Sequence, residues 1–256
     1  MDALDIFPLP AFEDNYIWVL RRGNAVAVVD PGDDTPVLDY LAASATHLVA
    51  ILATHHHGDH VGGITEIVAR YPVPVYGPAL EAIPGVDHGL ADGDNVALTE
   101  LGIEFAVLAV PGHTRGHLAY YRRGTLFCGD TLFGAGCGRL FEGTPAVMHA
   151  SLSRLKALPA DTSIYCAHEY TQANLRFATA VEPANAAVAA RNTAAQQLRA
   201  AGKPTVPSLL ADELATNPFL RWEAPAVIAA AQARLGRAPS DAVEVFATIR
   251  EWKNRF

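Results

Sequence analysis

The feature that most constrains this chain is a run of four histidines and an aspartate within seven residues, Thr54–His60. The run follows Leu48–Ala53, an apolar segment of strand length, and precedes Val61–Arg70, whose pattern predicts a helix opened by Asp59. It therefore lies at the carboxyl end of a strand, where open α/β sheets bind their ligands. Neutral imidazole and carboxylate are the ligands that zinc and similar divalent metals prefer. The pattern predicts a metal-binding α/β protein.

Composition narrows the class of protein further. The chain has 256 residues, half of them hydrophobic, which is enough for one large domain or for one domain and a smaller one. A net charge of -8 argues against a nucleic-acid partner, which needs a basic surface. No apolar run approaches the ~20 residues of a membrane span, and the acidic N-terminus does not resemble a secretory signal. Three cysteines without a CxxC pair fit a reducing compartment, so we expect a cytoplasmic protein, and we expect a monomer.

The chain changes character after about residue 170. Up to that point short apolar strands alternate with Gly/Pro turns, and Tyr16–Leu20 and Ala25–Val29 are predicted to form a hairpin. Beyond it alanine is dense, and helices are predicted at 184–201, 224–235 and 240–255. We therefore expect a two-sheet α/β domain over residues 1–170 and a helical domain over residues 171–256.

Three further strand ends carry a metal-binding side chain. His113, Asp130 and His168 each come just after an apolar strand. A lone histidine or aspartate at such a place is usually structural, but three beside a histidine cluster favour a shared site.

The candidate ligands are too many for one ion. A closed zinc site takes about four ligands and a catalytic one about three, so seven suit two ions that share a carboxylate and a solvent oxygen. In an extended loop His55 and His57 project to the same side, whereas His56 points away and is expected to lie in the core or to support the ligands. The seven are His55, His57, Asp59, His60, His113, Asp130 and His168.

The order of these ligands resembles the metallo-β-lactamase superfamily of binuclear metallohydrolases. Within it, the chain is most similar to the glyoxalase II (hydroxyacylglutathione hydrolase) family. The similarity spans nearly the whole chain, and the Gly-Cys-Gly segment and the basic tail are what distinguish the glutathione enzymes. The motifs that carry it are Thr54–Gly63, Pro111–His117, Gly129–Phe133, Gly136–Arg139, His168–Thr171, Asn217–Arg221 and Arg250–Phe256.

The resemblance implies a fold and a reaction. The fold is an αββα sandwich followed by a C-terminal α-helical domain. The reaction is hydrolysis of the thioester S-D-lactoylglutathione to glutathione and D-lactate, the second step of methylglyoxal detoxification. A hydroxide that bridges the two metals attacks the carbonyl, and Asp59, as a ligand, also orients that hydroxide.

The resemblance also implies which ion each ligand binds. His55, His57 and His113 bind one ion, Asp59, His60 and His168 bind the other, and Asp130 bridges. His117 corresponds to a non-ligand with a structural role. Zinc is the first expectation for both ions, with iron or manganese as alternatives, because His/Asp ligation suits all three.

The family's glutathione contacts correspond to five residues in this chain. Glutathione thioesters carry two carboxylates, so the pocket should present cations. Arg139 stands where lysine is common, and Phe141 stands where a tyrosine can occur, so one hydroxyl is absent. The five are Arg139, Phe141, Tyr170, Arg250 and Lys253.

Other functions remain open at this point. The main alternative is a persulfide dioxygenase with a single iron, which would leave the second ligand set idle. Another hydrolase of the same fold is the other alternative. Metal counting and identification would separate most of these possibilities.

Overall fold

The computed structural model describes residues 3–256, so the first two residues of the acidic N-terminus lie outside it. The chain divides into two compact units. Unit 1 comprises Met1–Val110 and Thr114–Gly129, and unit 2 comprises Pro111–His113 and Asp130–Phe256. Across residues 3–256, every helix is too short or too polar to cross a membrane. The domain boundary expected at residue 170 stays a prediction.

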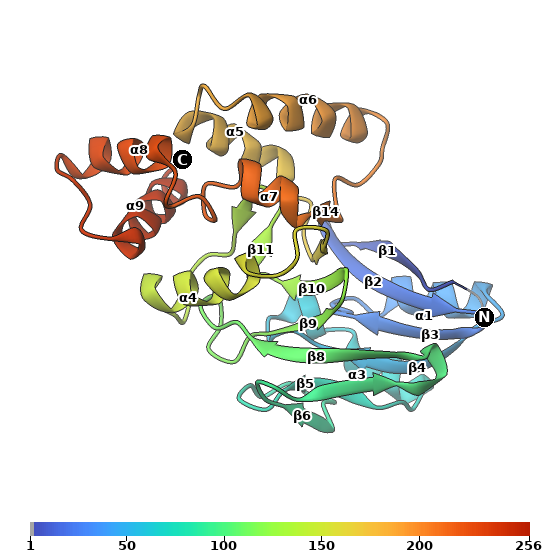
Figure 1. The fold of residues 1–256 in the computed structure, drawn as a ribbon. Coiled ribbons are helices and arrows are strands. Elements are labelled where there is room, and N and C mark those ends of the chain that lie inside the picture. Colours follow the sequence, from blue (N-terminus) through green and yellow to red (C-terminus); the bar gives the residue numbers. More distant parts are fainter. Residues whose placement is uncertain (1–2) are drawn as a thin grey trace. The chain divides into compact units, whose positions relative to one another are not determined.

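A six-stranded sheet with strand order β1-β2-β3-β4-β5-β6 organises unit 1 (Figure 1, blue to cyan). The strands β1 to β3 pair antiparallel, and the predicted hairpin between β2 and β3 is confirmed. From β3 to β6 the pairing is parallel. The elements up to β6 are β1 Asp5–Ala11, β2 Asn15–Arg22, β3 Ala25–Val29, α1 Thr35–Ala43, β4 His47–Leu52, α2 Gly58–Val61, α3 Ile64–Arg70, β5 Val75–Pro78 and β6 His88–Leu90.

The parallel pair β3 and β4 determines where the histidine run lies. All of β3 is apolar and buried, and β4 is apolar and mostly buried after its exposed first residue, His47, as expected for strands covered on both faces. The helices α1 and α3 contribute Val37, Leu41 and Ile64 to the core against this sheet. Because the two strands run in the same direction, their carboxyl ends meet at one edge, and the residues after β3 and after β4 become neighbours.

Unit 1 contains a second, antiparallel run of strands in the order β10-β9-β8-β7. Tyr120 on β9 is fully buried and donates its hydroxyl hydrogen to the carbonyl of Ala53, which follows β4, at 2.7 Å. Leu118 N–H donates to Thr54 O at 2.9 Å. These bonds attach the start of the histidine run to this second set of strands. The remaining elements of unit 1 are β7 Asn95–Leu98, η1 Thr99–Leu101, β8 Ile103–Ala109, β9 Leu118–Arg122 and β10 Thr125–Gly129.

The helix expected after the histidine run is divided in two. We expected one helix opened by Asp59, and this is wrong in detail, because α2 begins at Gly58 and ends before Gly62, and α3 begins at Ile64. A Cβ on Gly62 would lie 2.6 Å from Gly32 O, and one on Gly63 would lie 2.4 Å from the backbone nitrogen of Asp34. The close approach of the loop after β3 requires glycine here, and the two glycines interrupt the helix.

Unit 2 is mainly helical (Figure 1, yellow to red). All three predicted C-terminal helices are present as α6, α8 and α9, and Gly202 takes a left-handed φ of 69° just beyond α6. The helix α5 and the short α7 were not predicted. The elements are β11 Leu132–Phe133, β12 Gly136–Cys137, α4 Pro145–Lys156, β13 Ser163–Cys166, α5 Thr171–Val181, α6 Ala186–Ala200, β14 Ser208–Leu209, α7 Leu210–Thr216, α8 Pro225–Leu235 and α9 Ala242–Asn254.

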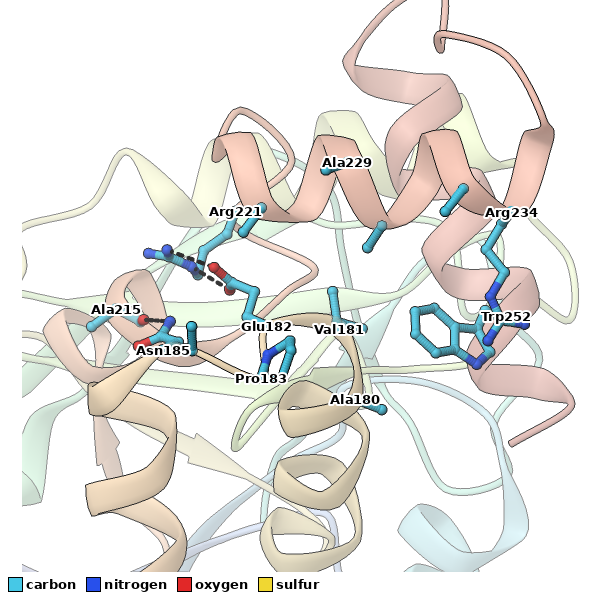
Figure 2. Close-up of a pocket in the computed structure, with 14 residues that line it drawn as sticks. Ala180, Val181, Glu182, Pro183, Asn185, Ala215, Arg221, Ala229, Arg234 and Trp252 are labelled. Atoms are coloured by element: carbon cyan, nitrogen blue, oxygen red, sulfur yellow. Dashed lines mark hydrogen bonds and ion pairs between the residues drawn. The ribbon is translucent and has the colours of Figure 1, made fainter.

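Aromatic side chains and ion pairs, among them Arg221–Glu182, hold the helices of unit 2 together. Phe177 of α5 contacts Phe219 and Trp252, and Phe219 contacts Phe246 of α9. Figure 2 shows Arg221 pointing toward Glu182, the residue after α5. Arg221 donates to the Glu182 carboxylate through Nε at 2.7 Å and through Nη2 at 3.0 Å. The helices thus form a well-packed body.

Candidate metal centre

The histidine run of unit 1 brings its side chains together as the sequence predicts. His55 and His60 are fully buried, whereas His57 and Asp59 are partly exposed. His55 Nε2 lies 3.1 Å from His57 Nδ1, and His60 Nε2 lies 3.6 Å from the Asp59 carboxylate. Two pairs of metal-binding atoms therefore converge within one loop.

Asp30, at the carboxyl end of β3, orients two of these imidazoles. Its carboxylate accepts hydrogen bonds from Thr54 N (2.7 Å), Thr54 Oγ1 (2.8 Å) and His60 Nδ1 (3.0 Å). Since the Thr54 hydroxyl donates to Asp30, it can accept from His55 Nδ1 at 3.1 Å. Both imidazoles then carry hydrogen on Nδ1, which leaves the Nε2 lone pair for a metal, and a carboxylate behind a histidine also raises its basicity.

Asn15 and Gly32 hold Asp59 in position. Asn15 Nδ2 donates to the Asp59 carboxylate at 3.1 Å and to the Asp59 carbonyl at 3.3 Å. A Cβ on Gly32 would lie 1.9 Å from the Asp59 carbonyl oxygen, so only glycine permits this approach. The Asp59 carboxylate is thereby directed before any ligand is present.

The other histidines of the two motifs pack against the rings of His55 and His57. His117 is fully buried and stacks on His55, with ring centroids 4.5 Å apart and an interplanar angle of 17°. His56 is partly exposed and lies edge-on to His57 at 4.9 Å. This arrangement fits a packing role for His117 and a supporting role for His56.

Unit 2 contains a second cluster, made by the three strand-end residues that it holds. Asp130 lies between two imidazoles, with one carboxylate oxygen 3.3 Å from His113 Nε2 and the other 3.4 Å from His168 Nε2. All three side chains are nearly fully buried. A carboxylate that presents one oxygen to each of two histidines has the geometry of a bridging ligand.

The ring of His113 is oriented by the backbone of Arg139. His113 Nδ1 lies 2.8 Å from the Arg139 carbonyl oxygen and donates to it, which directs Nε2 toward Asp130. A Cβ on Gly138 would lie 2.0 Å from Asp130 O and 3.0 Å from His113 Nδ1. The glycine at 138 is therefore required for the chain after Asp130 to fold back over the cluster.

A cavity of about 500 Å³ in unit 2 is lined by two residues of this cluster and by the predicted substrate contacts. His113 and Asp130 form part of its wall. A larger cavity of about 820 Å³, bordered by alanines of α8 and drawn in Figure 2, contains none of the predicted site residues. The smaller cavity is therefore the candidate substrate site, and all five predicted contacts line it: Arg139, Phe141, Tyr170, Arg250 and Lys253.

The two tail cations differ in environment. Arg250 is 94% buried, with its guanidinium 4.9 Å from the Phe219 ring centroid, and it donates through Nη1 to Cys137 O at 2.9 Å. Lys253 is half-buried, and its pKa is lowered to about 8, first by burial and then by Arg250. Arg176 and Arg139 lower this pKa further. Within residues 3–256 none of these four cations has an ion-pair partner, so the cluster is suited to an anionic ligand.

The donor atoms of both clusters suit divalent metals. Unit 1 supplies three imidazoles and one carboxylate, and unit 2 supplies two imidazoles and one carboxylate. The cysteines do not compete as ligands, because all three are buried and burial raises the pKa of Cys166 to about 12.

Two supporting residues in unit 1 were not predicted from the sequence. Asp30 follows an apolar strand in the same way as Asp130 and was not included among the candidates. Asn15 lies 44 residues from Asp59 and gives no sequence signal of its own. The strand-end criterion would have found the first and not the second.

Comparison with known proteins covers the whole chain. Residues 11–168 match the metallo-β-lactamase superfamily, and residues 169–256 match the hydroxyacylglutathione hydrolase C-terminus. The chain is similar to a hydroxyacylglutathione hydrolase of Nitrosomonas eutropha, with 51% identity over 99% of both chains. It is also similar to one of Pseudomonas fluorescens, with 54% identity over 99% of this chain and all of that one.

Solved structures show the same fold. The chain resembles ETHE1 from Myxococcus xanthus with a TM-score of 0.68 at 21% identity, over 97% of this chain and 90% of that one. It resembles the BLEG-1 B3 metallo-β-lactamase with a TM-score of 0.62 at 22% identity, over 85% of this chain and 99% of that one. A third structure, TTHA1623 in a di-iron-bound form, is 32% identical with a TM-score of 0.53, over 63% of this chain and 91% of that one. The metallo-β-lactamase fold with a C-terminal helical domain, expected from the sequence, is confirmed.

Proposed function

Because the chain belongs to the hydroxyacylglutathione hydrolase family of the metallo-β-lactamase superfamily, we propose that it hydrolyses S-(2-hydroxyacyl)glutathione thioesters. The typical substrate is S-D-lactoylglutathione, and the products are glutathione and D-lactate, as in the second step of methylglyoxal detoxification. The observation that carries the proposal is similarity over the full length, at 51–54% identity, to relatives that bear this name. The single-iron alternative is not favoured, because the match includes the helical C-terminus.

We further propose that seven side chains hold two divalent ions. His55, His57 and His113 would bind one ion, and Asp59, His60 and His168 the other. Asp130 would bridge, in keeping with its position between His113 and His168. The di-iron form of the relative TTHA1623 supports a pair of ions, with zinc as the first expectation here and iron or manganese as alternatives.

When bound, the ions would supply an activated water molecule and polarise the thioester carbonyl. The residues of the chain direct this chemistry. Asp59, held by Asn15, orients the attacking water, and Asp30 binds the Nδ1 hydrogen of His60, which leaves Nε2 available to an ion. The leaving group is a thiolate, which needs no strong general acid, so none is assigned.

The glutathione moiety would occupy the cavity of about 500 Å³. Lys253 and Arg139 would present positive charge to the carboxylates of glutathione. Arg250 would stabilise the cavity wall through its bond to Cys137 O and add a third positive charge. Tyr170 stacks on His168 at 4.7 Å and, with Phe141, supplies an aromatic surface. We take residues 1–170 as the metal domain and 171–256 as the substrate domain of a cytoplasmic monomer that binds neither nucleic acid nor membrane.

The test is hydrolysis of S-D-lactoylglutathione by purified protein loaded with zinc, iron or manganese. We expect saturable turnover that a chelator abolishes and that added metal restores. The oxygen concentration should remain constant during the assay, since a dioxygenase would consume oxygen. A metal-replete protein that leaves the thioester intact would refute the proposal.

A further inference from the structure

A fully buried carboxylate in unit 2 takes no part in the chemistry described so far. Glu213 on α7 accepts four hydrogen bonds. One oxygen accepts from Ser208 Oγ (2.7 Å) and from Arg191 Nη2, and the other accepts from Ala135 N (2.8 Å) and Asn217 Nδ2 (3.0 Å). A buried charge is tolerated when it is paired and bonded in this way. The carboxylate thus connects α6 and α7 to the loop of the β11–β12 hairpin.

That hairpin has little stability of its own. It pairs only Leu132 with Cys137 and Phe133 with Gly136, around a loop of two residues. The left-handed φ, +54°, falls on the second loop residue, Ala135, whose Cβ disfavours it. The two-residue turns that match the twist of a hairpin have positive φ at the first loop residue, so this turn needs contacts from outside.

Side chains around Glu213 supply those contacts. Asn217 Nδ2 donates to Gly136 O at 2.9 Å and, more weakly, to Phe133 O at 3.3 Å. The Glu213 carboxylate orients that same amide and also binds the Ala135 N–H. Asn174 Nδ2 donates to the Gly134 carbonyl at 3.0 Å. The polar backbone groups of the turn are therefore bound by buried side chains.

The hairpin forms one wall of the candidate substrate cavity. Phe133, Cys137 and Arg139 all line it. Arg250 donates to the Cys137 carbonyl, and His113 donates to the Arg139 carbonyl. A shift of the turn would move the cation at 139 and the anchoring point of Arg250.

We propose that Glu213 is a positioning residue for substrate binding, which acts by clamping the Gly134–Ala135 turn and so fixing the wall that contacts the glutathione moiety. The inference rests on the proposed function, because it takes the cavity as the glutathione site. Glu213 itself lies outside the set of residues that line this cavity.

The test variant is Glu213→Gln in the full, metal-loaded chain. Glutamine keeps the shape but replaces one acceptor oxygen with a donor, so either the Ala135 amide or Arg191 faces a donor. We expect faster hydrogen exchange at the Ala135 and Gly136 amides. The Kd of S-methylglutathione, a non-reactive thioether, and the KM of the thioester should both rise about five- to twentyfold, with kcat changed by less than about twofold.

Glu182→Gln is the matched control. Glu182 is also buried and paired with an arginine, Arg221, as Figure 2 shows. In the described chain its side chain bonds to none of residues 132–139. The control should lose stability in a similar way yet keep the KM, the Kd and the exchange rates of the hairpin.

A second variant covers the case in which Glu213→Gln does not fold. Asn217→Ala removes the bonds to Phe133 O and Gly136 O but leaves Glu213 paired with Arg191. It should raise KM and Kd in the same direction. In a double-mutant cycle the two changes should combine to less than their product, because both act through one turn.

The binding constants of these variants test the positioning role directly. Unchanged Kd and KM in a folded Glu213→Gln protein, or in Asn217→Ala if that variant alone folds, would overturn it. An equal rise in Glu182→Gln would overturn it too, since general loss of stability would then suffice. If the wild-type chain does not bind S-methylglutathione, the proposed substrate site fails together with this inference, whereas intact wild-type binding with an unaffected variant removes the inference alone.

Discussion

Binding of the glutathione moiety should weaken as the pH rises through 8, because Lys253 loses its charge there. The pKa of Lys253 is lowered to about 8 by burial and by the positive charges of Arg250, Arg176 and Arg139. Below this pKa the ammonium is present and can pair with a substrate carboxylate. Above it the side chain is neutral, so the attraction is lost.

The pKa sets the size of the effect. The protonated fraction of a group with a pKa of about 8 falls from about 0.9 at pH 7 to about 0.1 at pH 9. If only the ammonium form pairs with the carboxylate, Kd rises by about tenfold over this range. Binding by the neutral form would make the rise smaller.

The assay is calorimetric titration of the metal-loaded protein with S-methylglutathione between pH 7 and 9. This ligand has no ionisable thiol, but its amino group titrates near the end of the range. The control is Lys253→Arg, which keeps its charge throughout and experiences the same change in the ligand. We expect the wild-type Kd to rise about tenfold more than that of the variant. Equal pH dependence in the two proteins would refute the assignment of Lys253 as an anion-binding cation.

Other predictions concern the metal ligands and stability. Asp130→Ala should reduce the metal content from two ions to less than one per chain by elemental analysis, whereas His56→Ala should leave the metal content nearly unchanged. Loss of metal in His56→Ala and not in Asp130→Ala would mean that His56, and not its neighbours His55 and His57, faces the ions. Asp30→Asn should weaken metal affinity about 10- to 100-fold in competition with a chelator, because Asp30 orients His60, and unaltered affinity would contradict that role. Lys253→Met should raise the unfolding temperature at pH 7, because it removes a half-buried cation next to Arg250. Since folding lowers the pKa of Lys253, burying its ammonium destabilises the folded protein fully below pH 8, and this destabilisation disappears as the pH rises past the unfolded pKa of 10.5. The rise in unfolding temperature should therefore vanish at high pH, and a rise that persists there would reject this explanation.

Much of the candidate metal centre could be predicted because the proposed ligands follow apolar strands. The end of a buried strand is visible in a single sequence, and the pairing of β3 with β4 places such ends at one edge. His55, His57 and the strand-end Asp130 were found in this way. Their division between two ions came from the family resemblance and not from spacing.

What the sequence could not reveal are contacts between residues far apart in the chain. Asn15 reaches Asp59 across 44 residues, and Ala135 reaches Glu213 across 78. Neither belongs to a local pattern, because only the tertiary fold makes them neighbours. The same limit explains Arg250, which the sequence shows only as part of a basic tail and which is buried against Phe219 and Cys137. The helix break at Gly62–Gly63 also depends on a distant loop, the one after β3.

The most direct test of the proposed activity is steady-state hydrolysis of S-D-lactoylglutathione by the purified chain, measured together with the number of metal ions bound. We predict two ions per chain and saturable release of glutathione, which chelation abolishes and added metal restores. Protein that carries two ions per chain and still fails to release glutathione from this thioester would contradict the proposed activity.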